Sequence, residues 1–202
     1  MRWSGHLKHD GVLRAHGLAT YEQSRHAALG LGAHRFRAFL QRVLDLAREL
    51  EHVDLFVSKA AGEVLRQYKQ KLDLPETARV YKDSAASSPQ VGYFYHGVYH
   101  TLVVAPATSN IVAKFVYGIS DNLASNVFAQ AGKCRVPSIV FACDTAPELE
   151  TRSPDGMVKV FPRRIDLENF GKLKRFEATQ VAESLSELKE LIARRRSDLT
   201  VA

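Results

Sequence analysis

The sequence has little of what would indicate export, membrane insertion or a cysteine-based site. It contains two cysteines among 202 residues, Cys134 and Cys143, and no window of 18 or more apolar residues that could cross a membrane. Its first residues, MRWSGHLKHDG, lack the apolar core of a signal peptide. We therefore expect a cytoplasmic protein with reduced thiols, in which Cys143 packs in the core, and we predict no metal site.

Acidic residues are fewer than basic ones, and the formal net charge is +6. Part of this charge is the run Arg194–Arg196, which is typical of a solvated helix end. A nucleic-acid-binding surface would interleave basic residues with exposed aromatic residues, whereas the aromatic residues here lie within apolar runs. Nucleic acid is therefore not an expected partner, and the positive charge equally suits an anionic cofactor or substrate.

Apolar runs alternate with helical patterns along the chain. The runs predict buried strands at 53–57, 100–106 and 137–143, with a short strand beginning at 79. The helical patterns cover 34–51, 60–72, 109–132, 166–175 and 182–197. Residues 144–165 are predicted to be an irregular excursion. This order predicts an α/β domain with a three-layer Rossmann-like (flavodoxin-like) fold, its parallel sheet covered by helices on both faces. We expect one domain over 26–202, preceded by an atypical N-terminal extension over 1–25.

In such sheets ligands bind beyond the carboxyl ends of the strands. The strand at 100–106 leads into the turn Ala105 to Asn110, rich in small hydroxyl and amide side chains. A hydroxyl at Thr108 or Ser109 can cap the following helix, whose free N–H groups favour an anion. Lys114, one turn into that helix, can reach back to a phosphate or face solvent. The turn is therefore either a phosphate-binding site or a well-capped helix start.

Three other stretches follow predicted strands. Ser58 and Lys59 begin a helix, where capping is the simpler interpretation. The Ser-rich loop 83–89 suits close contact with a flat ligand, although such loops often have no ligand. Residues 26–35 begin like a strand and contain Gly-X-Gly, a truncated dinucleotide fingerprint in which Arg35 replaces the third small residue. We interpret this stretch as a phosphate-side loop, with His34 facing either the ligand or solvent.

Three segments together resemble the homo-oligomeric flavin-containing Cys decarboxylase superfamily. They are APATSNIVAK (105–114), YGISDNLASNVFAQAGK (117–133) and PSIVFACDTAPELET (137–151). Within the superfamily the likeness is to flavoproteins that reduce dihydromethanopterin, and VKVFPRRIDLEN (158–169) strengthens it. The resemblance covers about residues 28–175.

The resemblance implies FMN bound at the strand ends and a homo-oligomer built from trimers. It implies that hydride passes from flavin N5 to a C=N bond of a dihydropterin. In the family the Pro-Ala-Thr-Ser-Asn turn contacts the flavin phosphate and ribityl chain, and the residue after the second strand, here Ser58, also contacts the cofactor. The apolar residues of 110–131 spread beyond one face, which predicts an interface element. The predicted cofactor-binding residues are Gly30, Gly32, Ala33, His34, Ser58, Lys59, Ser84, Ser87, Ser88, Ala105, Pro106, Ala107, Thr108, Ser109, Asn110, Lys114 and Asp144.

The sequence departs from the family in three places. The loop GLGAH (30–34) has no hydroxyl, and WSGHL (3–7) partly resembles the same element. The region CDTAPELETRSPDG (143–156) lacks the Met-Asn pair and the Trp of the decarboxylases, which argues against cysteine decarboxylation. No complete Gly-x-Gly-x-x-Gly is present, so no dedicated NAD(P) domain is predicted.

The catalytic acid and the electron donor are not identified by the sequence. Asp144, Glu148 and His34 are candidates for the acid. The leading hypothesis is a dihydropterin reductase. The alternatives are another FMN enzyme of the superfamily, a decarboxylase or flavin prenyltransferase, or a non-enzymatic FMN electron-transfer protein.

Overall fold

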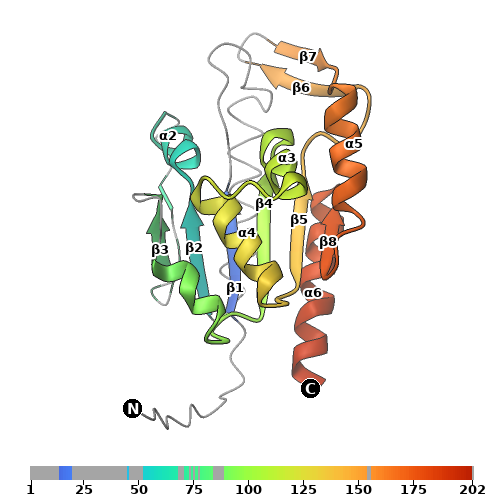
Figure 1. The fold of residues 1–202 in the computed structure, drawn as a ribbon. Helices are drawn as coiled ribbons and strands as arrows, with labels where there is room; N and C mark the ends of the chain where they lie inside the picture. Colours follow the sequence, from blue (N-terminus) through green and yellow to red (C-terminus); the bar gives the residue numbers. More distant parts are fainter. Residues whose placement is uncertain are drawn as a thin grey trace, which may run out of the picture.

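The computed structural model describes residues 14–19, 45, 52–67, 71–72, 74, 76, 78–83, 89–153 and 156–201. These residues form a six-stranded sheet in the order β3-β2-β1-β4-β5-β8, with every neighbouring pair parallel (Figure 1). The strands are β1 (Arg14–Ala19), β2 (His52–Val57), β3 (Arg79–Lys82), β4 (Thr101–Ala107), β5 (Ser138–Ala142) and β8 (Thr179–Ala182). The strand order reverses between β1 and β4, which is where ligands bind in such sheets.

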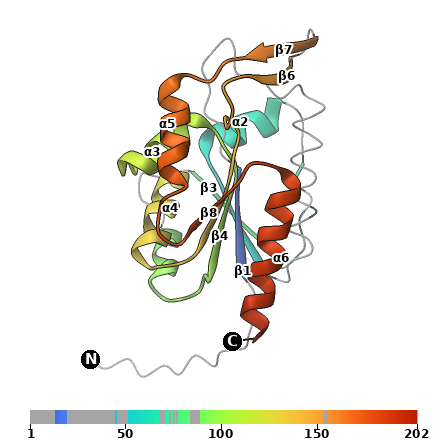
Figure 2. The same cartoon turned by 90° about the vertical axis from the view of Figure 1, so that its right-hand side faces the viewer.

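Helices cover both faces of the sheet, as the sequence predicts. They are α2 (Lys59–Gln67), α3 (Ser109–Tyr117), α4 (Leu123–Lys133), α5 (Arg164–Leu173) and α6 (Leu185–Val201), and a 3-10 helix η1 spans Pro89–Phe94. Figure 2 shows α4 and α6 on opposite faces. Successive residues of β4 alternate between the two cores. Val104 packs in the cluster with α3 and α4, and Val103 packs with Leu188 and Ile192 of α6. None of the helices in the described residues is long and apolar enough to span a bilayer.

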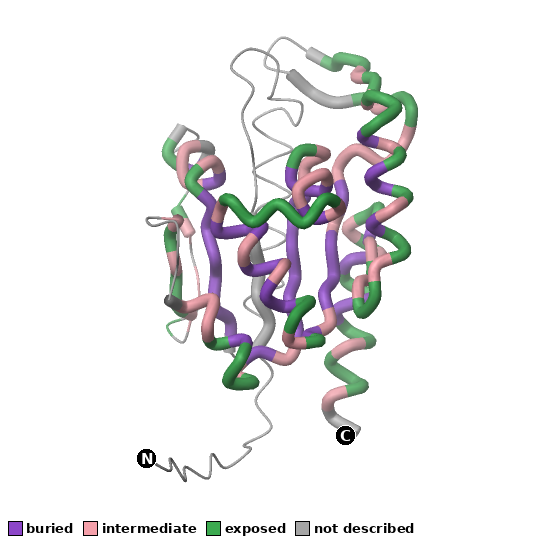
Figure 3. The backbone as a smooth tube through the Cα atoms, in the orientation of Figure 1, coloured by how far each residue is buried: buried purple, intermediate pink, exposed green. Residues whose placement is uncertain are grey.

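All seven residues of β4 are buried, which accounts for the apolar run that follows Thr101 (Figure 3). The sequence does not predict the edge strand β8, because TQVA contains polar residues and forms no apolar run. The basic run near the C-terminus is less solvated than expected. Arg195 is half-buried and donates to Thr101 Oγ1 and to the His100 carbonyl, each at 3.1 Å, which ties α6 to the start of β4.

The predicted helix 109–132 is two helices. It is interrupted at Gly118, whose φ of 68° is left-handed and whose N–H bonds to the carbonyls of the preceding turn. A second helix starts after Asn122, whose side chain accepts a hydrogen bond from the Ser125 N–H while the Ser125 hydroxyl accepts one from the Asn122 N–H. The two helices then pack together through the stacked rings of Phe115 and Phe128, 3.8 Å between centroids.

The N-terminal part of the chain differs from the expected boundary. β1 lies within 1–25, the segment expected to be an extension, and it pairs with β2 on one side and β4 on the other. Its sequence, RAHGLA, was not recognised as a strand because Arg14 and His16 interrupt the apolar pattern. The strand-like stretch 26–35 lies outside the described residues.

The excursion after β5 contains an antiparallel hairpin that was not predicted. Its strands are β6 (Leu149–Ser153) and β7 (Gly156–Val160), and it lies beyond the carboxyl edge of the sheet (Figure 1). Both strands carry charged residues, so neither presents the apolar run that identified β2, β4 and β5. The hairpin leads directly into α5, which packs against α3.

Candidate functional site

The turn between β4 and α3 contains an unpaired buried hydroxyl. Thr108 is the N-cap residue of α3, with φ −73° and ψ 162°, but its side chain makes no capping hydrogen bond. Thr108 Oγ1 is buried and has no hydrogen-bond partner within the described part of the chain. Leaving such a group unpaired costs about 1–3 kcal/mol. The turn therefore fits a ligand that hydrogen-bonds to this hydroxyl.

A carboxylate, rather than the Thr108 hydroxyl, occupies the N-terminus of α3. The Ser109 N–H donates to Asp144 Oδ2 at 3.2 Å, and the Cys143 N–H donates to the Ala107 carbonyl at 3.0 Å. These bonds hold the end of β5 against the turn. A carboxylate at a helix N-terminus already satisfies the helix dipole and would repel a phosphate placed beside it. The turn is thus better suited to an uncharged part of a ligand than to a phosphate.

Ser58 acts as the N-cap of α2. Its Oγ accepts a hydrogen bond from the Ala61 N–H at 3.1 Å, and its carbonyl accepts one from the Gly62 N–H at 2.9 Å. The side chain is buried, so this bond keeps the first turn of α2 fixed at the end of β2. The structure thus gives Ser58 the capping role that the sequence left open beside a ligand role.

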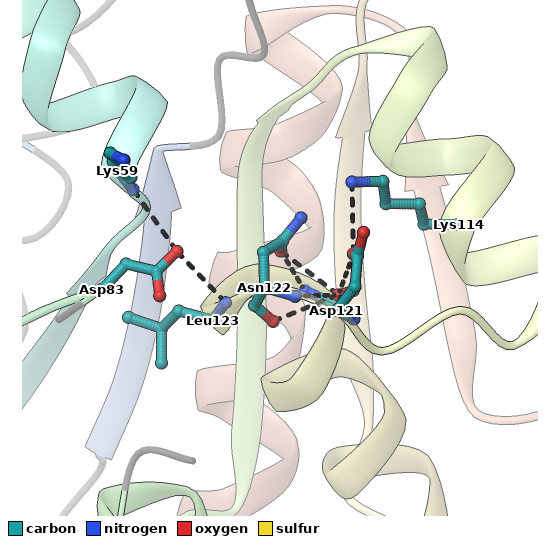
Figure 4. A network of polar contacts seen from close by, with 7 residues as sticks. Lys59, Asp83, Lys114, Asp121, Asn122 and Leu123 are labelled. Carbon is teal, nitrogen blue, oxygen red and sulfur yellow. Dashed lines mark hydrogen bonds and ion pairs between the residues drawn. The ribbon is translucent and has the colours of Figure 1, made fainter. Parts of the chain in front are cut away.

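A polar network joins α2, α4 and α3 across the carboxyl edge of the sheet (Figure 4). Asp83 Oδ2 accepts from the Lys59 N–H at 3.5 Å and from the Leu123 N–H at 3.4 Å. Beyond this point Lys114 Nζ pairs with Asp121 Oδ1 at 3.2 Å. One carboxylate therefore stabilises two helix N-termini, and Lys114 is held near the start of α4 rather than facing solvent alone.

The predicted residues divide into two sets. Those at the carboxyl edge, in or beside the β4 turn or at the start of α2, are Ser58, Lys59, Ala105, Pro106, Ala107, Thr108, Ser109, Asn110, Lys114 and Asp144. Those outside the described residues are Gly30, Gly32, Ala33, His34, Ser84, Ser87 and Ser88. Asn110 is exposed at the second position of α3, whereas Ala105 and Ala107 are fully buried.

The catalytic-acid candidates also separate. Asp144 lies in the site, and His34 is outside the described residues. Glu148 is exposed and forms an ion pair with Lys159 Nζ at 2.5 Å, which links the start of the hairpin to β7. Burial, followed by the Asp144 charge, raises the pKa of the Cys143 thiol to about 12, so little of the nucleophilic thiolate is present at neutral pH.

Asp83 and Asn122 are among the residues of the network that were not predicted as binding residues. Asp83 directly follows β3, so inspecting the residue after each strand identifies its position. Asn122 precedes Ser125 by three residues, which is the spacing of a capping box. The contact between Asp144 and Ser109 spans 35 residues and has no local sequence signal.

Comparisons with known proteins show the family of the chain. The model of the Flavoprotein family matches residues 37–197. Dihydromethanopterin reductase (acceptor) of Methanosarcina mazei is 39% identical over 130 residues, which cover 57% of this chain and 54% of that protein. The chain thus spans about half the length of this curated relative. An uncharacterised protein of Methanocaldococcus jannaschii is 33% identical over 163 residues, 76% of this chain and 87% of that protein.

A solved structure extends the likeness to nearly the whole chain. DmrB of Burkholderia xenovorans, determined in complex with FMN and described as a cubic protein cage for redox transfer, is 42% identical. It covers 95% of this chain, which in turn covers 98% of DmrB, and the TM-score is 0.75. With most of its length matched by the family model, the chain belongs to the Flavoprotein family.

Proposed function

We propose that this chain is an FMN-dependent oxidoreductase that reduces a dihydropterin. The observation that carries the proposal is the buried Thr108 hydroxyl at the end of β4, which has no hydrogen-bond partner among the described residues. It lies beside the point where the strand order reverses, where ligands bind in such sheets. A 42% identical protein solved with FMN and the relatives named as dihydromethanopterin reductases support the same function.

The residues at the turn fit the uncharged parts of a flavin. Thr108 would hydrogen-bond the ribityl chain, and the buried Ala105 and Ala107 leave the strand end free of bulky side chains. Asp144 fixes the first N–H of α3, so the turn keeps its shape with or without the cofactor. The flavin phosphate would then bind away from Asp144, and Gly30 to His34 are our predicted residues for it. When bound, FMN supplies hydride from N5 to a C=N bond of the pterin.

We also propose a homo-oligomer built from trimers, on the precedent of the cage formed by DmrB. The sequence predicts an interface element in the segment 110–131, where Ile119 is 47% exposed. Most of its apolar residues, Ile111, Val112, Phe115, Leu123, Val127 and Phe128, are buried within the protomer. The hairpin, the residue that follows it and α5 also carry exposed apolar side chains: Met157, Val158, Phe161 and Ile165 are 53%, 39%, 67% and 42% exposed.

Anaerobic turnover tests the proposed reaction. The protein is loaded with FMN, photoreduced and mixed with a dihydropterin, while flavin absorbance and the tetrahydropterin product are followed. We expect the flavin to reoxidise in step with tetrahydropterin formation. Reduced flavin that persists in the presence of the pterin but reoxidises with a one-electron acceptor would identify an electron-transfer protein instead.

A further inference from the structure

A cavity lies at the carboxyl edge of the sheet, between α2 and the end of β3. Its volume is about 690 Å³, within the roughly 300–1,000 Å³ of small-molecule sites. Four cationic residues line it, Lys59, Arg66, Lys71 and Lys82, together with a single carboxylate, Asp83, among the described lining residues. A cavity with this excess of positive charge is suited to an anion.

Asp83 forms no ion pair with these cations in the described part of the chain, and its single charge leaves the lining net positive. Asp83 Oδ2 accepts hydrogen bonds from the backbone N–H groups of Lys59 and Leu123, at the starts of α2 and α4 (Figure 4). Within the part of the chain that the structure describes, the side chains of Lys59, Arg66 and Lys82 have no ion pair. Like charges that share a cavity repel one another until an anion enters.

Arg66 contributes to this lining from the last turn of α2. Its Nη1 lies 3.8 Å from the position that a Cβ on Gly62 would occupy. The guanidinium therefore lies over the residue one turn earlier, as long side chains on a helix ordinarily do, and it lines the cavity. The nearby N–H groups of Ala61 and Gly62 already bond to Ser58. The charge that favours an anion in this cavity therefore comes from the cationic side chains rather than from the helix end.

We propose that this α2–β3 pocket binds the phosphate group of a ligand other than the flavin. The inference rests on the proposed function, because the ligand would be one of the two redox substrates. Guanidinium and ammonium groups together bind phosphate through short, charge-assisted hydrogen bonds. A phosphate on a nicotinamide dinucleotide donor and one on the side chain of the pterin share this chemistry. Asp83 connects the pocket to the start of α4, so a ligand held there lies next to the network that borders the β4 turn.

Pyrophosphate titration of the FMN-loaded protein tests the pocket. Binding is measured by calorimetry at low salt for the wild type, Arg66→Gln and Lys82→Gln. A charge-assisted hydrogen bond is worth about 1.5–3 kcal/mol, so each variant should bind roughly tenfold more weakly or worse. The matched control is Lys189→Gln on α6, an exposed residue outside the pocket lining, which should bind as the wild type does.

FMN affinity of the apoprotein is measured for the same variants and should not change. Absence of pyrophosphate binding, undiminished binding in Arg66→Gln, or displacement of FMN by pyrophosphate would overturn the proposal. Competition by NADPH but not NADH assigns the pocket to the donor, and competition only by a pterin with a phosphorylated side chain assigns it to the acceptor. Competition by neither overturns the link to the redox substrates. Variant-dependent pyrophosphate binding in a protein that binds no flavin would instead leave the pocket standing and refute the proposed function.

Discussion

Two threonines at opposite ends of β4 carry the same side chain in different surroundings. Thr101 is 3% exposed, and its Oγ1 accepts a hydrogen bond from Arg195 Nε at 3.1 Å. Thr108 Oγ1 is buried without a partner among the described residues. A structural hydroxyl is hydrogen-bonded within the chain, whereas an unpaired one costs stability that a ligand can restore. This contrast separates a structural threonine from a candidate binding residue.

Thr108→Val should therefore weaken FMN binding without destabilising the apoprotein. Loss of one hydrogen bond is worth about 0.5–1.5 kcal/mol, so the dissociation constant should rise roughly two- to tenfold. Flavin fluorescence titration and apoprotein melts measure the two effects. Thr101→Val should show the reverse, a lower melting temperature and an unchanged FMN affinity. An unchanged affinity in Thr108→Val would mean that the hydroxyl does not contact the flavin.

At the scale of the element, the break between α3 and α4 depends on Gly118. Its φ of 68° is strained for any residue with a Cβ. Gly118→Ala should therefore lower the free energy of unfolding by about 1–2 kcal/mol. Gly132→Ala, inside α4 with nothing within 4 Å of the added Cβ, should raise it by roughly 0.5–1 kcal/mol. Chemical denaturation measures both, and equal effects of the two changes would refute this account of the break.

The start of α5 should contribute a pH-dependent part of the stability. Asp166 accepts hydrogen bonds from the backbone N–H and guanidinium of Arg163, and these lower the pKa of its carboxyl. A carboxyl with a depressed folded-state pKa stabilises the fold above its ordinary pKa, and this stabilisation is lost as the pH falls through the folded-state value.

Asp166→Asn should therefore cost about 1 kcal/mol at neutral pH, with the difference from the wild type vanishing in acid. Denaturant melts from pH 7 to pH 2 measure this. Glu168→Gln removes an exposed pair with Arg164 and should change stability little at any pH. A constant difference between Asp166→Asn and the wild type down to pH 2 would contradict the assignment.

The elements that the sequence predicts are those whose pattern is local. β2, β4 and β5 are buried on both faces and read as apolar runs, and the turn after β4 follows from its position at a strand end. β1 and the β6–β7 hairpin carry polar residues, so their strand character depends on partners far along the chain. The same holds in the site, since the missing partner of Thr108 and the bond from Ser109 to Asp144 exist only once β4 and β5 are side by side.

At the scale of the whole molecule, the apolar surface on the hairpin and α5 predicts assembly. Phe161 is 67% exposed and lies between β7 and α5. Phe161→Asp should shift the protein to smaller species in light scattering, because a charge in an apolar interface is costly. Ser186→Asp places the same charge on the exposed surface of α6 and should leave the assembly intact. A wild type that is monomeric and flavin-loaded at micromolar concentration would contradict the proposed oligomer.

The central claim is that the turn after β4 belongs to an FMN site, and titration of the apoprotein with FMN and FAD in parallel tests it most directly. We predict one FMN bound per chain and weaker or no binding of FAD, with a mass matching FMN for the flavin that heat releases from the complex. Saturable binding of FAD alone, or no flavin bound in excess FMN, would contradict the account.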